Sequence, residues 1–281
     1  MIKADRQAVD SSHGVESEKV AFDPPGLTGR VPVPNGEMLV VRDVPAAFCS
    51  IVAAILGQSP RSRRSIALSG GPTAKKCYEA LSAYSVSSCM DWSGVAIFMS
   101  DERCVPMDHP DSNSGMVRET LVAKIGKLGA FHPMDCVAGP EAYSSIISGV
   151  LPFDLIHLGM GPDGHTASLF PGSPLLDYDP PGHNSSDDHK PSRRLPDENK
   201  PSDRPPGISL VALSRDPNHL NPYDRMTLTL PAINASRHAI FTVAGKEKLQ
   251  AMKRVSAGDG IPALRVHAGI VVWIVDEDAA P

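Results

Sequence analysis

The chain has 281 residues, of which 41% are hydrophobic and 21% charged, and its formal net charge at pH 7 is −5. These values are ordinary for a globular protein with a substantial core, and the length suits one large α/β domain or two small ones. A net negative charge gives no support for a basic binding face, so we expect no nucleic-acid partner.

The cysteines are five in number, scattered along the chain and without a CxxC pair: Cys49, Cys77, Cys89, Cys104 and Cys136. We therefore expect reduced thiols, with neither a disulfide frame nor a zinc cluster. No apolar run approaches the length of a membrane span, and the polar beginning of the chain lacks the apolar region of a signal peptide. The expectation is a soluble, cytoplasmic protein with no membrane partner.

The first 35 residues are polar and contain Pro24, Pro25 and Pro32, so we predict a flexible N-terminal segment followed by a domain over residues 36–281. Residues 37–42 have the composition of a first strand. Residues 44–57 carry alanines and apolar residues at helical spacing, which predicts a helix that ends at Gly57.

A second strand is predicted over residues 65–68, and an amphipathic helix runs through residue 81. Between them lie Ser69, Gly70, Gly71 and Thr73. A glycine turn that leads into a helix points free N–H groups and the positive end of the helix dipole at one spot, which favours an anion. The alternative is a tight turn in which Thr73 only caps the helix, and this stretch alone leaves both possibilities open.

A third strand is predicted over residues 94–100, and the charged residues Asp101, Glu102 and Arg103 follow it. A loop then leads to a helix near residues 116–125. Charged side chains at the carboxyl end of a strand are candidates for a site. The alternative is a surface turn with one internal ion pair.

Another helix is predicted over residues 141–151, and a short apolar strand follows it. The strand opens onto a loop that holds Gly159, Gly161 and Gly164 together with Asp163 and His165. Ligands bind at the carboxyl ends of strands in open α/β sheets, and glycines let the backbone approach a ligand closely. An imidazole titrates near neutral pH, and a neighbouring carboxylate can fix its tautomer, so the pair suits general base catalysis. A lone histidine is usually structural, but this one is not alone.

The same loop matches the pattern G-x-G-x-x-G, so a dinucleotide-binding site must be considered. That fingerprint needs a long helix packed directly behind its third glycine, whereas Pro171 interrupts the chain soon after His165. The match also comes late in the chain. We therefore expect no nicotinamide cofactor.

Residues 177–207 contain seven prolines, many charges and few apolar residues: Pro180, Pro181, Pro191, Pro196, Pro201, Pro205 and Pro206. Such a segment cannot bury a core, and we predict a mobile insertion. Its histidines and aspartates (His183, Asp187, Asp188 and His189) could hold a metal, but a solvated polar tract is the favoured interpretation, and we expect no metal site.

Order is predicted to return with strands over residues 208–213 and 226–230 and a turn or helix start over residues 231–235. A strand over residues 238–243, a helix over 246–255 and a last strand over 269–275 follow. Strands that alternate with helices predict an α/β fold with a mostly parallel sheet, flanked by helices.

Four stretches together resemble the 6-phosphogluconolactonase family, which shares its fold with the glucosamine-6-phosphate deaminases. They are residues 69–73 (SGGPT), residues 100–113 (SDERCVP and DHPDSN), residues 158–172 (LGMGPDGHTASLFPG) and residues 225–234 (RMTLTLPAIN), which continue to GKEK at 245–248. They occur in the order typical of the family. The departures are the long insertion and the Pro72-Thr73-Ala74 spelling, where the family more often has Ser-Thr-Pro.

The resemblance implies a Rossmann-like α/β fold, no cofactor, and hydrolysis of 6-phospho-D-glucono-1,5-lactone to 6-phosphogluconate in the oxidative pentose phosphate pathway. It implies that the Ser69–Thr73 loop holds the phosphate, with Lys248 and one arginine as counter-charges. We favour Arg103 for that arginine and place Arg225 second. His165 is then the general base, and Asp163 orients it.

Two other functions are considered. In the related deaminases an acid residue matches Asp101, and the histidine loop continues to Asn-Glu-Pro-Gly, where the glutamate assists ring opening. Here Phe170 stands before Pro171 and Gly172, and an aromatic ring cannot move a proton, so the lactonase is favoured. Asp101 is then expected to support Arg103 or the loop. The second alternative is a catalytically silent sugar-phosphate sensor, which needs no base. The expected partner is a small sugar phosphate, and the expected state is a monomer or weak homodimer.

Overall fold

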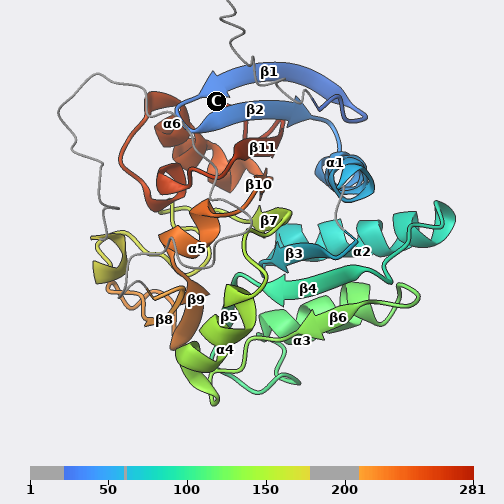
Figure 1. Cartoon of the computed structure of the whole chain (residues 1–281). Coiled ribbons are helices and arrows are strands. Elements are labelled where there is room, and N and C mark those ends of the chain that lie inside the picture. The colour runs from blue at the N-terminus through green and yellow to red at the C-terminus, as the bar shows by residue number, and fades with distance from the viewer. Residues whose placement is uncertain (1–21, 60–61, 178–208) are drawn as a thin grey trace, which may run out of the picture.

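The structure, a computed structural model, describes residues 22–59, 62–177 and 209–281 (Figure 1). Its strands are β1 (Leu27–Val33), β2 (Gly36–Val41), β3 (Arg64–Leu68), β4 (Val95–Met99), β5 (Asp101–Arg103), β6 (Ala130–His132), β7 (Leu155–Leu158), β8 (Val211–Ser214), β9 (Arg225–Leu228), β10 (His238–Val243) and β11 (Ile270–Asp276). Its longer helices are α1 (Val44–Gln58), α2 (Pro72–Ser87), α4 (Gly139–Ser148) and α6 (Leu249–Ala257). Its short helices are α3 (Asn113–Val117), η1 (Arg118–Val122), η2 (Pro174–Leu176), α5 (Leu230–Asn234), η3 (Lys246–Lys248) and η4 (Pro262–Arg265).

An eight-stranded sheet forms the centre, in the order β1-β2-β11-β10-β7-β3-β4-β6. All neighbouring strands in it are parallel except β1 and β2. Parallel strands are covered on both faces and are therefore continuously apolar. The four residues of β7 are all buried, and Trp273 of β11 stacks on Phe241 of β10 with ring centroids 3.9 Å apart. The predicted α/β class with a mostly parallel sheet is confirmed.

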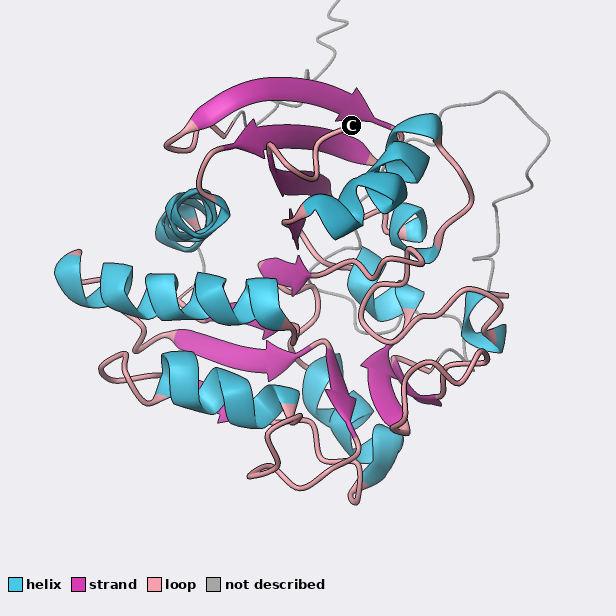
Figure 2. Ribbon diagram, turned by 180° about the vertical axis from the view of Figure 1, so that it is seen from behind, coloured by secondary structure: helices cyan, strands magenta, loops and turns pink. Residues whose placement is uncertain are grey.

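Helices α1 and α2 lie side by side against the sheet, as both views of the ribbon show (Figures 1 and 2). Asp43 starts α1 by accepting a hydrogen bond from the N–H of Ala46 at 2.9 Å. Phe48 of α1 and Tyr78 of α2 pack together with ring centroids 6.2 Å apart. The helices thereby bring a phenol and an aromatic ring against the middle of β7.

A second sheet of three antiparallel strands, β5-β9-β8, lies beyond the carboxyl end of β4. Here the alternative of a surface turn at residues 101–103 is wrong, because Asp101 and Glu102 are buried within β5. The Glu102 carboxylate accepts hydrogen bonds from the backbone N–H groups of Asn113 at 2.6 Å and Ser114 at 2.7 Å, where α3 begins. Strand β5 therefore anchors the loop that follows it.

The prediction that residues 1 to about 35 fray is wrong for residues 22–35. Strand β1 pairs antiparallel with β2 along its length and extends the sheet by one strand. Pro32 lies on this edge strand, where its missing N–H costs no ladder hydrogen bond. Residues 1–21 lie outside the described residues, as does nearly all of the predicted insertion at 177–207, including His183, Asp187, Asp188 and His189.

The expectation that all cysteines are reduced is wrong for one pair. Cys104 and Cys136 form a disulfide, with Cα atoms 5.4 Å apart across a sequence separation of 32 residues. Cys104 follows β5 and Cys136 follows β6, so the folding of two different sheets brings the thiols together. Cys49, Cys77 and Cys89 are free.

Two expected features can be compared with the part of the chain that the structure describes. None of its helices has the length and apolar character needed to cross a membrane. Within the same ranges, no group of three or more histidine, cysteine, aspartate or glutamate side chains is arranged to hold a metal ion.

Candidate active site

A cavity of about 310 Å³ opens at the carboxyl ends of β3, β4, β7 and β10, and β9 contributes to its wall. Most of the residues predicted from the sequence line it: Ser69, Gly70, Gly71, Thr73, Asp101, Arg103, Gly161, His165, Arg225 and Lys248. Asp163 lies behind His165, and Gly164 packs against Ile261. The parallel sheet thus brings three loops that are far apart in sequence to one opening.

His165 and Asp163 form a hydrogen-bonded pair at the cavity wall. Nδ1 of His165 is 2.6 Å from Oδ1 of Asp163, and the backbone N–H of His165 donates to the same oxygen at 3.1 Å. A carboxylate only accepts, so the proton of the neutral imidazole lies on Nδ1. The lone pair of Nε2 is then available, and this is the tautomer that a general base requires.

The electrostatic setting of Asp163 keeps it ionised. Burial by itself would raise the pKa of this carboxyl, but the hydrogen bonds from His165 and the charge of its ring outweigh burial, and the net pKa is lowered. Arg254 also donates to the backbone carbonyl of Asp163 at 3.1 Å, which holds the loop in place. Asp163 therefore stays an acceptor through the neutral pH range.

Gly161 seats the imidazole. A Cβ at Gly161 would lie 2.2 Å from Cε1 and Nδ1 of His165, closer than side-chain atoms ever approach. The ring thus packs directly on the backbone of the loop, while its other neighbour, Phe170, has its ring centroid 4.9 Å away. The sequence predicts that Gly161 contributes to binding. The structure shows in addition that the absence of a side chain at Gly161 makes room for the imidazole of His165.

We expect Gly161→Ala to lower kcat about tenfold to a hundredfold, because displacing a reacting group by about 1 Å has effects of this size. Steady-state rates of the variant measure it. The matched control is Gly159→Ala on the same loop and the same cavity wall, whose methyl group would meet no protein atom within 4 Å and so leaves His165 in place; it should keep more activity than Gly161→Ala. Equal activity of both variants would contradict this assignment.

The turn after β3 has the form expected of an anion site. Gly71 has a φ of +104°, a conformation that favours glycine, and it precedes the first residue of the 16-residue helix α2. No side chain caps the helix, so the alternative role of Thr73 as a cap is wrong. The helix N-terminus faces the cavity with its backbone donors.

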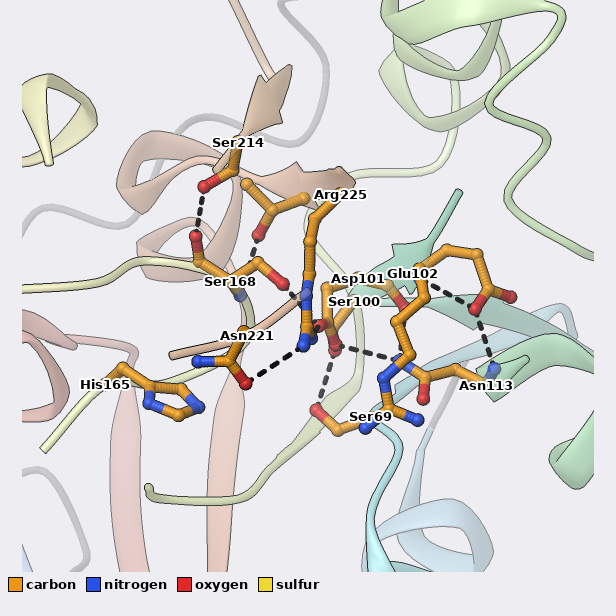
Figure 3. Close-up of polar contacts among 12 residues, drawn as sticks. Ser69, Ser100, Asp101, Glu102, Asn113, His165, Ser168, Ser214, Asn221 and Arg225 are labelled. Atoms are coloured by element: carbon orange, nitrogen blue, oxygen red, sulfur yellow. Dashed lines mark hydrogen bonds and ion pairs between the residues drawn. The ribbon is translucent and has the colours of Figure 1, made fainter. Parts of the chain in front are cut away.

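The hydroxyl of Ser69 does not donate to the cavity. Its oxygen donates to the backbone carbonyl of His157 at 2.8 Å and lies 2.7 Å from the hydroxyl of Ser100 (Figure 3). Ser69 is 3% exposed, so its single proton is used inside the protein. The serine ties the ends of β3, β4 and β7 together.

Asp101 is held by several donors. Ser168 donates to Oδ2 at 2.7 Å, and the amide of Asn113 donates to the backbone carbonyl at 3.0 Å. Asp101 was expected to support Arg103 or the loop. The bond from Asn113 ties Asp101 to the following loop, and its ion pair is with Arg225 and not with Arg103, with Nη1 of Arg225 3.9 Å from Oδ2. Figure 3 shows the Arg225 guanidinium between Asp101 and Asn221. Burial lowers the pKa of Arg225, and the charge of Asp101 opposes this.

Arg103 and Lys248 supply positive charge from two other directions. Arg103 donates to the backbone carbonyl of Asp111 at 2.8 Å. Lys248 donates to the backbone carbonyl of Met160 at 2.9 Å, in the loop that carries His165. Burial lowers the pKa of Lys248, and the charges of Glu247 and Asp163 oppose that shift.

Sequence reasoning missed Asn113 and Asn221, which also line the cavity. The amide of Asn221 accepts from Arg225 at 3.2 Å and donates to Asp216 at 2.8 Å. Their only sequence signal is closeness to a charged motif, which many loop asparagines share. The buried His157 was also missed, although a titratable residue inside an apolar strand is a usable signal.

The comparison with protein families agrees with this geometry. Residues 40–273 match the family of glucosamine-6-phosphate isomerases/6-phosphogluconolactonase, so the match covers most of the chain. The chain belongs to this family.

Particular relatives are named for the lactonase. The chain is 32% identical over 264 residues to a 6-phosphogluconolactonase of Synechocystis sp., covering 87% of this chain and 94% of that protein. It is 29% identical to a 6-phosphogluconolactonase of Homo sapiens, with 85% and 89% covered.

Solved structures with the same fold include both activities of the family. The 6-phosphogluconolactonase of Trypanosoma brucei superposes with a TM-score of 0.67 at 26% identity, covering 89% of this chain and 98% of that one. A monomeric glucosamine-6-phosphate deaminase superposes with a TM-score of 0.62 at 16% identity, covering 86% and 98%. The second likeness concerns the fold alone, so the site must decide between the two reactions.

Proposed function

We propose that this chain hydrolyses 6-phospho-D-glucono-1,5-lactone to 6-phospho-D-gluconate, as in the oxidative pentose phosphate pathway. The observation that carries the proposal is that His165, held from behind by Asp163, lines the same cavity as the helix N-terminus after β3 and two arginines. A base at one wall and an anion site at another suit a substrate with a reactive carbonyl and a phosphate tail.

The phosphate end is supported by the pairing of β5 with β9. Arg103 and Arg225 are direct Cα partners across these antiparallel strands, and both line the cavity. Like charges placed opposite each other on a sheet are destabilising, and negative charge beside each of them relieves the repulsion. The N–H groups at the start of α2 add donors from the opposite side.

We assign the phosphate counter-charge to Arg103. Asp101 already balances the charge of Arg225 at 3.9 Å, and Arg225 is buried. Arg103, in contrast, donates to a neutral backbone carbonyl and keeps its charge for a ligand. Arg225 then serves mainly to shape the cavity wall with Asn221.

We expect Arg103→Met to raise KM for the phosphorylated lactone about tenfold to a hundredfold with little change in kcat. A hydrogen bond to a charged group contributes about 1.5–3 kcal/mol, which corresponds to this range. The readout is the ratio of kcat/KM for the phosphorylated lactone to that for glucono-1,5-lactone. Arg118→Met, which changes an exposed arginine of η1, is the control. An unchanged ratio in Arg103→Met would argue against the assignment.

At the lactone end, a water molecule attacks C1 while Nε2 of His165 takes its proton. Asp163 stabilises the imidazolium that forms, and His165 then returns the proton to the departing ring oxygen. Phe170 is fully buried and packs beside His165, so the imidazole has an apolar neighbour on one side.

The N–H groups of Gly161 and Gly164 are not available to the tetrahedral oxyanion. The N–H of Gly161 donates to the backbone carbonyl of His165 at 2.9 Å, and that of Gly164 to the carbonyl of Gly161 at 3.0 Å. Both are therefore occupied by the loop itself. We assign the oxyanion to Lys248, whose ammonium group is anchored to this loop at Met160.

The experiment that tests the function is a lactone-opening assay on fresh substrate, with the spontaneous opening subtracted and glucosamine 6-phosphate run in parallel. We expect turnover of the lactone and none of the amino sugar. Release of ammonia from glucosamine 6-phosphate would support the deaminase instead. Binding of 6-phosphogluconate in a thermal-shift assay without lactone turnover would support the sensor.

The location and assembly of the protein are also proposals. We propose a cytoplasmic monomer or weak homodimer in which β1 belongs to the same domain as the rest of the central sheet. The exposed free thiol of Cys89 supports a reducing compartment, whereas the Cys104–Cys136 disulfide is more typical of an oxidising one. Imaging of a fluorescent fusion and light scattering on the purified chain decide these points.

A further inference from the structure

A buried hydrogen-bond network lies beneath the turn that we assign to the phosphate. Its centre is the hydroxyl of Tyr78, which is 2.8 Å from the backbone carbonyl of Ser69, 3.1 Å from the N–H of Ser69 and 2.7 Å from Nδ1 of His157. Nε2 of His157 is 2.9 Å from the hydroxyl of Thr242. Tyr78 and His157 are both fully buried, and neither has a part in the mechanism above.

The protons of this network can be assigned. Burial lowers the pKa of His157 to about 3 and raises that of Tyr78 well above its usual value, so both are neutral. A phenol has one proton and accepts through its lone pairs. If Tyr78 donates to the carbonyl of Ser69, it accepts from the N–H of Ser69 and from Nδ1–H of His157. Nε2 then accepts from Thr242, and every member is satisfied.

The network connects the residue before the phosphate turn to the helix that follows the turn. Ser69 is where β3 gives way to the turn, and Tyr78 lies on α2, the helix that begins after it. Between these two points lie Gly70 and Gly71, which have no side chains to hold their conformation. The phenol therefore fixes both backbone polar groups of Ser69 from the helix itself, and His157 fixes the phenol from β7.

We propose that Tyr78 and His157 are positioning residues that hold the Ser69–Thr73 turn in its phosphate-binding shape. The inference rests on the proposed function only for the identity of the anion. Removing the phenol oxygen leaves the N–H and carbonyl of Ser69 without their buried partner, so the turn gains alternative conformations and binds phosphate less tightly.

A second buried tyrosine provides a matched control. The hydroxyl of Tyr143 is 2.7 Å from the N–H of Met99, 3.2 Å from the carbonyl of His132 and 3.3 Å from the carbonyl of Met99, so it also contacts both backbone groups of one residue. Tyr143 is also fully packed in the core, but its partner Met99 lies within β4 and not in the phosphate turn. Tyr143→Phe therefore reports the general cost of removing such a hydroxyl.

The experiment is calorimetric titration of the full chain and its variants with 6-phosphogluconate and with gluconate. For Tyr78→Phe we expect Kd for 6-phosphogluconate to rise about tenfold and Kd for gluconate to stay within twofold. For Tyr143→Phe we expect a similar loss in Tm and no change in either Kd. Thr242→Val, which keeps the side-chain shape, should weaken 6-phosphogluconate binding in the same direction by about threefold.

Two results would overturn the inference: a Tyr78→Phe variant that binds 6-phosphogluconate as tightly as the unaltered chain, or an equal loss in Tyr143→Phe. Because the experiment measures binding, it tests the positioning role independently of the proposed hydrolysis. An unaltered chain that binds 6-phosphogluconate but opens no lactone contradicts the hydrolysis, while weaker binding by Tyr78→Phe still supports the positioning role.

Discussion

Replacing His165 by alanine should lower kcat by about a hundredfold or more and leave KM nearly unchanged. General base catalysis contributes a factor of about this size, and an interaction made only in the transition state affects kcat more than binding. The imidazole lines the cavity, and among the residues that the structure describes its Nε2 has no hydrogen-bond partner, while Asp163 holds its other nitrogen at 2.6 Å. The measurement is the initial rate on fresh lactone, corrected for spontaneous opening.

The control for this variant is His238→Gln. His238 begins β10 and so lies at the amino end of the strand, whereas the cavity opens at the carboxyl end. Its Nδ1 is 2.9 Å from the carbonyl of Asp154. This variant should keep kcat even where it lowers Tm. A near-normal kcat in His165→Ala would remove His165 from the mechanism.

Asp163→Asn is expected to lower kcat by about a hundredfold or more, as His165→Ala does, because Asp163 acts through His165. The amide of asparagine can donate an N–H to Nδ1 of His165, and the ring proton then lies on Nε2. In this tautomer Nε2 has no lone pair with which to accept a proton from water. Loss of the orienting carboxylate in a comparable catalytic arrangement costs about 10⁴ in kcat. Retention of more than a tenth of the activity would contradict the role of Asp163 in setting the tautomer.

The same variant has a second readout in stability. The pKa of Asp163 is lowered in the folded chain, so its contribution to stability is present above the unfolded pKa of about 3.9 and is lost as pH falls through the folded pKa. Tm of Asp163→Asn should therefore be lower than that of the unaltered chain at pH 7, and the gap should close in acid. Asp91→Asn changes a similar aspartate, which accepts from the N–H two residues on at 2.9 Å, but should leave kcat unchanged.

The local pattern of the sequence was enough to place most of the fold. Apolar runs predict β3, β4, β7, β10 and β11, because strands buried on both faces must be apolar throughout. Glycine turns at their carboxyl ends, together with the Asp163–His165 spacing, identify the opening of the cavity. These signals are local, and local chemistry determines where a strand ends and a helix begins.

What the sequence missed are pairings between distant segments. The polar composition of residues 1–35 predicts a flexible segment and does not reveal β1, because β1 is an edge strand whose strand partner in the described sheet is β2. The sequence leaves a surface turn open as the alternative for residues 101–103, because three consecutive charged residues do not indicate a buried strand. The burial of β5 depends on its pairing with β9. The disulfide between Cys104 and Cys136 has no sequence signal, since two sheets must first come together.

The sequence by itself determined the α/β class, the position of the cavity and the two residues of the proposed base. Only the tertiary structure decided which charged groups pair: Asp101 forms its ion pair with Arg225, and Arg103 contacts a neutral carbonyl and can bind an anion. It also decided that the Ser69 hydroxyl points inward and that Tyr78 and His157 support the turn. The physical reason is that a hydrogen bond or ion pair between residues far apart in sequence exists only when strand pairing has fixed the distance between them.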